Sequence, residues 1–190
     1  MRSTTIKPVA AAVLLIGWLS GCVGAGSNSP VEPLSPDQFP KVDGLNLLGE
    51  EIALPAGFEG EANLVSMGFE HRHQEDINTW IAALPEIQEA APDLRFYEVP
   101  VIYEGNALFR WWLNNGMRIG VVEEEARRRT VTVYTDRDRF RDAIDLTNIE
   151  EIHTLLLDGD GRVVWRAPGR FEAAFKDMIV DLSNKLADDS

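Results

Sequence analysis

Apolar residues along this chain follow two spacings: continuous runs typical of buried strands, and a three-to-four-residue repeat typical of helices. Residues 63–69 form a nearly continuous apolar run, which predicts a central strand. The next segment, about residues 75–90, has helical spacing and predicts a helix that Pro85 would kink. The predicted inward face of this helix consists of Ile77, Trp80, Ile81, Leu84 and Ile87.

The same two patterns continue through the middle of the chain. They predict strands at about 95–102 and 130–134 and helices at about 106–117 and 136–144. Asp136 or Asp138 can cap the second of these helices, because a short side-chain oxygen accepts from free backbone N–H groups at a helix start. The charged run Glu123–Arg129 predicts a solvated, ion-paired loop.

The clearest hairpin lies near the carboxyl terminus. It joins His153–Asp158 to Arg162–Arg166 through Gly-Asp-Gly, and a helix at about 171–186 follows. The predicted inward residues of that helix are Phe175, Met178, Ile179 and Leu182. A second, shorter hairpin is predicted at residues 45–55, before the first central strand. Alternating strands and helices predict a single α/β domain over residues 43–190, with a central mixed β-sheet flanked by helices and an N-terminal hairpin extension.

The first 21 residues have the features of a signal peptide. A short basic region precedes an apolar run, Val9–Leu19, which is too short to span a bilayer as a helix. Leu19-Ser-Gly-Cys22 follows and resembles a bacterial lipobox, in which cleavage precedes a lipidated cysteine. We therefore expect lipidation at Cys22 and a flexible tether over residues 22–42, which are rich in Gly, Ser, Asn and Pro.

The signal peptide and the lipobox predict a lipid-anchored domain of a bacterial cell envelope that faces the periplasm. Val23 stands where an aspartate would favour the inner membrane, so the outer membrane is slightly favoured. Removing the signal peptide takes the formal charge from −13 to −15. Such a surface repels nucleic acid and anionic lipid, so we expect no nucleic-acid partner and membrane contact through the anchor alone.

The strand, loop and helix over residues 63–80 resemble the opening of a thioredoxin-like domain. In that superfamily the loop carries Cys-x-x-Cys, and here the two positions fall on Arg72 and Glu75. The cis-proline that faces this loop is replaced by His153, where we expect a trans peptide. Disulfide exchange needs a thiolate, so the resemblance implies a redox-inactive domain.

Two narrower resemblances bear on function. Asn63-Leu-Val-Ser, Thr79-Trp80 and Val164-Trp165-Arg166 are similar to the Cys-poor mitochondrial ATP-synthase assembly-factor family. Sco-type copper chaperones are similar in placing a histidine before the hairpin strand, as His153 is here. That second resemblance implies a copper or zinc site made by His71, His73 and His153.

The sequence leaves these alternatives open. A His-x-His pair in a polar loop is often solvated, His153 can simply bond backbone, and both soft cysteine ligands are missing. The leading hypothesis is therefore a redox-inactive, membrane-anchored module without a catalytic residue or cofactor, which binds an envelope protein during complex assembly. The alternative is a metal-binding, chaperone-like domain. An enzyme using Arg72 and Glu75 has no nucleophile–base pair to support it.

Overall fold

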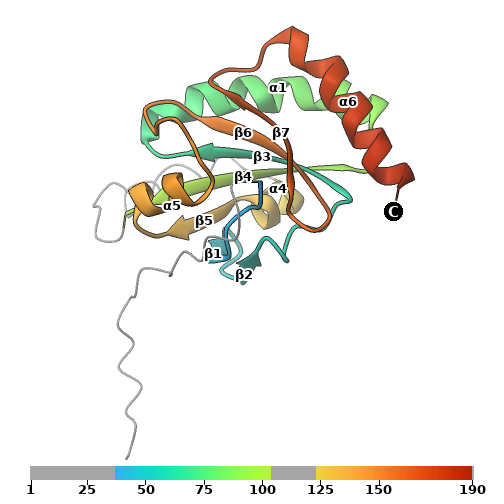
Figure 1. Cartoon of the computed structure of the whole chain (residues 1–190). Coiled ribbons are helices and arrows are strands. Elements are labelled where there is room, and N and C mark those ends of the chain that lie inside the picture. The colour runs from blue at the N-terminus through green and yellow to red at the C-terminus, as the bar shows by residue number, and fades with distance from the viewer. Residues whose placement is uncertain (1–36, 104–122, 190) are drawn as a thin grey trace, which may run out of the picture.

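The computed structural model describes residues 37–103 and 123–189. Its strands form one mixed seven-stranded sheet in the order β2–β1–β5–β4–β3–β6–β7 (Figure 1). The strands are β1 (Val42–Asn46), β2 (Glu51–Leu54), β3 (Ala62–Gly68), β4 (Leu94–Ile102), β5 (Val131–Tyr134), β6 (His153–Asp158) and β7 (Val163–Pro168). The helices are η1 (His71–His73), α1 (Gln74–Ala90), α4 (Glu124–Arg129), α5 (Arg137–Ala143) and α6 (Ala173–Asp188).

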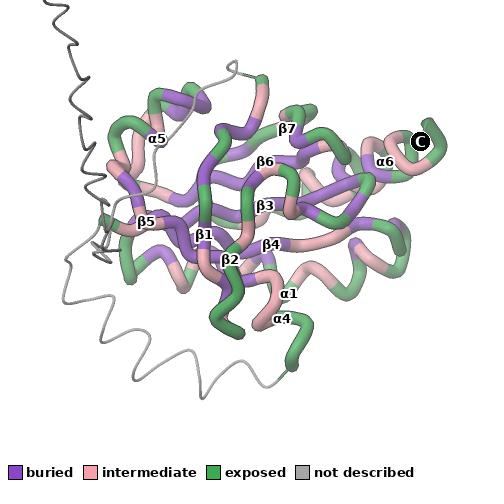
Figure 2. The backbone as a smooth tube through the Cα atoms, turned by 90° about the horizontal axis from the view of Figure 1, so that it is seen from below, coloured by how far each residue is buried: buried purple, intermediate pink, exposed green. Residues whose placement is uncertain are grey.

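The central strand β3 is buried along its whole length, as its apolar run predicts. It pairs in parallel with β4 on one side and antiparallel with β6 on the other. Successive side chains of a strand point to opposite faces of the sheet. Accordingly, Val65 and Met67 belong to one core cluster, and Leu64 belongs to the cluster on the opposite face. Figure 2 shows this buried centre in the strands, with exposed residues gathered on the peripheral helices and turns.

Helices α1 and α6 lie together over the face that carries Leu64 (Figure 1). Trp80 is fully buried between them and the sheet, and its indole Nε1–H donates to the Gly169 carbonyl at 3.0 Å. The opposite face is covered by α5 and by the segment before β1, where Phe39 packs edge-on against Phe58 and Phe140. The predicted single α/β domain with a mixed central sheet and an N-terminal hairpin is confirmed.

Several local predictions need correction. Ile81 and Met178, both predicted to face inward, are 40% and 49% exposed. Each lies at the margin of its helix's apolar stripe, where helical spacing alone does not show how far the sheet extends. Residues 124–129 form the short helix α4 and not a loop, although their predicted ion pairs are present between Arg128 and Glu124 and between Arg129 and Glu125. Helix α1 continues through Pro85.

Other predictions lie outside the described residues. These are the signal peptide, the lipidation site Cys22, most of the tether and the helix at 106–117. Within residues 37–103 and 123–189, no helix has both the length and the hydropathy needed to cross a membrane.

Candidate functional site

The predicted site lies where β3 and β4 end and β6 begins. β6 runs antiparallel to β3, so His153 at its start pairs in register with Met67 near the end of β3. Residues 69–73 lead from β3 into η1 and α1, and residues 144–152 lead into β6. The structure therefore places the two loops that the sequence singled out beside each other.

His73 joins these loops through both of its ring nitrogens. Its side chain is buried, Nδ1 accepts from the Phe69 backbone N–H at 3.0 Å, and Nε2 lies 3.0 Å from the Glu150 carbonyl oxygen. A carbonyl oxygen only accepts, so Nε2 carries the proton and Nδ1 the lone pair. These two hydrogen bonds leave no ring nitrogen of His73 available to a metal ion.

Arg72 reaches the same carbonyl from the exposed side. Its guanidinium donates to the Glu150 carbonyl at 2.8 Å and to the Glu70 carboxylate at 2.6 Å. The hydrogen bond between Arg72 and Glu70 lowers the pKa of Glu70 and raises the pKa of Arg72. The pair is solvent-exposed and therefore weakly stabilising. Arg72 thus fastens one loop to the other.

His153 is also held by backbone. It is only 5% exposed, and its Nε2–H donates to the Asn148 carbonyl at 2.9 Å. Burial lowers its pKa, which favours the neutral ring. Among the described peptide bonds the cis bond is Leu54–Pro55, so the bond before His153 is trans, as predicted.

Further hydrogen bonds fix the two loops from outside. Arg137 at the start of α5 donates to the Phe69 carbonyl at 3.0 Å. Asn148 accepts from the Glu150 backbone N–H at 2.9 Å and donates to Glu151 at 3.3 Å. These hydrogen bonds fasten the two loops into one structural unit.

The three predicted metal ligands are not assembled into a site. His71 is exposed on the surface, whereas His73 and His153 are buried and bonded to backbone. Within the described residues, no group of three or more His, Cys, Asp or Glu side chains could hold an ion. Backbone groups of the two loops bond both ring nitrogens of His73 and Nε2 of His153, which a metal would need. Glu75 is exposed in the first turn of α1, where a negative charge favours the helix dipole.

Sequence reasoning missed Glu98, a carboxylate buried in β4. Only 7% of it is exposed, and burial raises its pKa to about 7 against an opposing hydrogen bond from Gln74. The signal was available, since a glutamate at the centre of an otherwise apolar predicted strand must face either a helix or solvent. Val99 and Val101 of the same strand lie in one core cluster, and Phe96 packs against the other.

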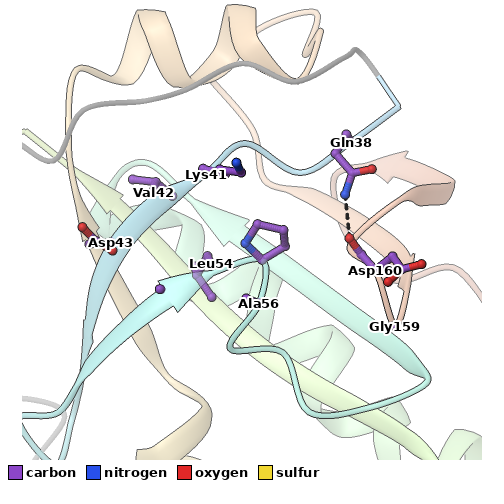
Figure 3. Close-up of a pocket in the computed structure, with 10 residues that line it drawn as sticks. Gln38, Lys41, Val42, Asp43, Leu54, Ala56, Gly159 and Asp160 are labelled. Carbon is purple, nitrogen blue, oxygen red and sulfur yellow. Dashed lines mark hydrogen bonds between the residues drawn. The ribbon is translucent and has the colours of Figure 1, made fainter.

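A separate cavity of about 640 Å³ lies near the opposite end of β6 (Figure 3). It is bounded by the segment before β1, by the end of β2 and by the β6–β7 turn. The Gln38 side chain donates across one end of it to the Asp160 carbonyl at 2.7 Å. Lys41 and Asp43 bring opposite charges to its wall. The residues that line this cavity are not those of the loop pair.

Comparison with known proteins gives the fold and little more. No protein-family model matches the chain, and no curated protein matches its sequence. A candidate electron transfer protein of Aquifex aeolicus VF5 is similar in structure, with a TM-score of 0.52, 14% identity, and coverage of 80% of this chain and 96% of that one. BsSco, a member of the Sco family of cytochrome c oxidase assembly proteins, is also similar in structure. Its TM-score is 0.52, with 13% identity and coverage of 82% of this chain and 96% of that one.

A third similar structure is the exposed lipoprotein thioredoxin Etrx1 of Streptococcus pneumoniae TIGR4. Its TM-score is 0.44, with 14% identity over 76% of this chain and 98% of that one. Identities this low establish the fold alone. The chain has a thioredoxin-like fold, and the predicted resemblance is confirmed at that level.

Proposed function

We propose that this protein is a lipid-anchored, redox-inactive thioredoxin-like module of a bacterial cell envelope. In this proposal it binds an envelope protein during assembly of a membrane complex. The observation that carries the proposal is the hydrogen bonding of His73 and Arg72 to the Glu150 carbonyl. Structural bonds occupy the place where the fold's catalytic members keep their thiols.

The absence of a thiol supports redox inactivity. The only cysteine in the sequence is Cys22, which the lipobox assigns to the anchor. Disulfide exchange proceeds by thiolate attack, and no other side chain replaces that nucleophile. The purified mature domain is expected to leave insulin disulfides intact at every pH between about 5 and 9, measured by the turbidity of precipitating insulin chains. Turnover that persists after contaminating oxidoreductases are removed would refute this part of the proposal.

The outer surface of the fastened loops is the proposed binding surface. His71, Arg72 and Glu75 are exposed there, and half of Tyr103 is exposed at the end of β4. Aromatic and arginine side chains are enriched in protein interfaces. A loop that is already ordered loses little entropy on binding, which favours a docking role.

Attachment through lipid is supported by sequence and charge. Leu19-Ser-Gly-Cys22 supplies the anchor, and the residues before β1 supply a tether long enough to lift the domain from the membrane. The net negative charge disfavours direct contact with anionic headgroups. No observation favours the metal-binding alternative, because the described residues lack a group of ligands for it.

Site-directed photo-crosslinking in cells tests the docking surface. A photoreactive amino acid at position 71 or 75 is expected to give one discrete adduct with an envelope protein. The matched control is position 181, which is exposed on α6 away from the loops. Absence of adducts from 71 and 75, or an identical adduct from 181, would exclude the loop surface as the binding site.

A further inference from the structure

Glu98 belongs to a row of polar side chains that crosses the buried face of the sheet. It pairs in register with Ser66 of β3, and its backbone forms an isolated parallel β-bridge with Thr130, the residue before β5. Ser66 pairs in turn with Thr154 of β6. All four residues are at most 7% exposed. Polar residues in register on adjacent strands share one face, which here is the face covered by α1.

Within this row the hydrogen bonding of Glu98 is incomplete. Ser66 and Thr154 bond each other through their hydroxyl oxygens at 2.8 Å, and Thr130 donates to the Ala126 carbonyl at 2.9 Å. Glu98 receives a hydrogen bond from Gln74, but its Oε1 has no partner among the described residues. A protonated carboxyl tolerates such a site far better than a carboxylate does, because burying an unpaired charge costs much more than burying a neutral polar group.

No charged side chain within the described residues compensates Glu98 from the elements around it. β3 offers Ser66, the residue before β5 is Thr130, and α1 offers Gln74. Glu75 and Asp76 of the same α1 turn carry no hydrogen bond to it, and Arg129 beside Thr130 is bonded to Glu125 and lies over the Tyr97 ring. The balance between the neutral and charged forms is therefore set by burial.

Gln74 connects this buried carboxyl to the fastened loops. It is the first residue of α1 and directly follows His73, whose ring joins Phe69 to Glu150. The Gln74 hydrogen bond favours the charged form of Glu98, but burial beneath α1 disfavours that form more strongly, so ionisation of Glu98 favours opening of the first turn of α1. Residues 69–73 of the proposed binding surface lead directly into this turn.

We propose that Glu98 is a proton-dependent latch for the β3–α1 loop: the protonated carboxyl keeps the start of α1 seated on the sheet, and its ionisation releases that turn. Release loosens residues 69–78 locally while the rest of the sheet stays folded. The latch does not depend on the identity of any partner, so it can be tested without one.

Hydrogen exchange of the full mature protein tests the latch. Protection of amides 69–78, corrected for intrinsic exchange, is expected to fall about tenfold between pH 5.5 and 8.5, because ionisation of Glu98 favours local opening of this segment. Glu98→Gln keeps the shape and removes the titration, so its protection at 69–78 should be equal at both pH values. The matched control is Glu75→Gln, which removes an exposed carboxylate from the same turn and should retain the wild-type response.

Three results would overturn the proposal. These are unchanged wild-type protection, a pH response of the same size in Glu98→Gln, or a response spread evenly over the whole sheet. If Glu98→Gln does not fold, the carbon NMR shift of the Glu98 carboxyl in the wild type decides the matter. A midpoint below about pH 5.5, close to an ordinary glutamate, would show that the group is already ionised at neutral pH.

Discussion

Two histidines in the β3–α1 loop have opposite environments although one residue separates them. His73 is buried and bonded at both nitrogens, whereas His71 is exposed. A side chain that satisfies two buried backbone groups is costly to remove, because those groups are left without partners. The same substitution at an exposed position has little effect.

The first prediction follows from this difference. His73→Ala should lower the free energy of unfolding by about 2–4 kcal/mol, since the Phe69 N–H and the Glu150 carbonyl each lose a partner. His71→Ala should change it by less than about 0.5 kcal/mol. Urea denaturation followed by tryptophan fluorescence measures both. Equal effects of the two substitutions would contradict the structural role of His73.

A second prediction for a single residue concerns Glu98 and pH. Its folded-state pKa of about 7 lies above the ordinary 4.5, so the native state binds the extra proton. Its contribution to stability is fully present below pH 4.5 and is lost as pH rises to about 7, by about 3 kcal/mol in total. Denaturation series across this range should show the decline in the wild type. Glu98→Gln should show a flatter profile, and an equal slope in both proteins would rule out Glu98 as its source.

Among the secondary-structure elements, the β6–β7 hairpin depends on one residue of its turn. Gly161 has a φ of +80°, and a Cβ built there would overlap the Pro55 ring. Asp158 accepts from the Asp160 and Arg162 backbone N–H groups at 3.0 and 2.7 Å and so closes the turn. The turn therefore needs glycine for both its backbone conformation and its close approach to the β2 end.

The third prediction separates these two requirements. Gly49 in the β1–β2 turn has a φ of +89° with nothing within 4 Å of a built Cβ. Gly49→Ala should therefore cost only the backbone term, about 1 kcal/mol. Gly161→Ala should cost about 1–3 kcal/mol more, because the added methyl group overpacks against Pro55. Thermal or urea unfolding of the two variants gives the comparison, and equal losses would show that the contact with Pro55 relaxes freely.

At the scale of the whole molecule, we propose that a lipid-anchored N-terminal segment precedes the described domain. The described domain is held together by two apolar clusters on the two faces of one sheet. The sequence carries an excess of acidic residues, which makes an anchor rather than the domain surface the proposed means of membrane attachment.

The fourth prediction tests that attachment. Cells grown with a fatty-acid analogue should label the wild-type protein and leave Cys22→Ser unlabelled, since the lipobox provides one acceptor. Cys22→Ser should also leave the membrane fraction, because stable attachment requires the acyl chains. The domain itself should keep its melting temperature. Membrane retention of Cys22→Ser would indicate a different means of attachment.

Features that depend on local spacing and on residue chemistry could be predicted from the amino-acid order. The apolar run at 63–69 and the hairpin around Gly161 stand in the structure as predicted. Of the two predicted caps, Asp136 is the one that caps its helix, where it accepts from the Asp138 and Arg139 backbone N–H groups. These features depend on neighbours within a few residues, where periodicity and turn chemistry are decisive. The lack of thiols after Cys22 likewise follows from composition.

The role of each polar side chain became clear only from the folded arrangement. The spacing of His71 and His73 and the position of His153 suggested one shared ion. In the structure, Nε2 of His73 bonds the Glu150 carbonyl, 77 residues away in sequence. Nε2 of His153 bonds the Asn148 carbonyl, five residues away. Glu98 is buried on the face of the sheet that α1 covers, and its Oε1 is left without a described partner. Hydrogen bonds and desolvation depend on which atoms meet across the fold, and a one-dimensional pattern does not contain those distances.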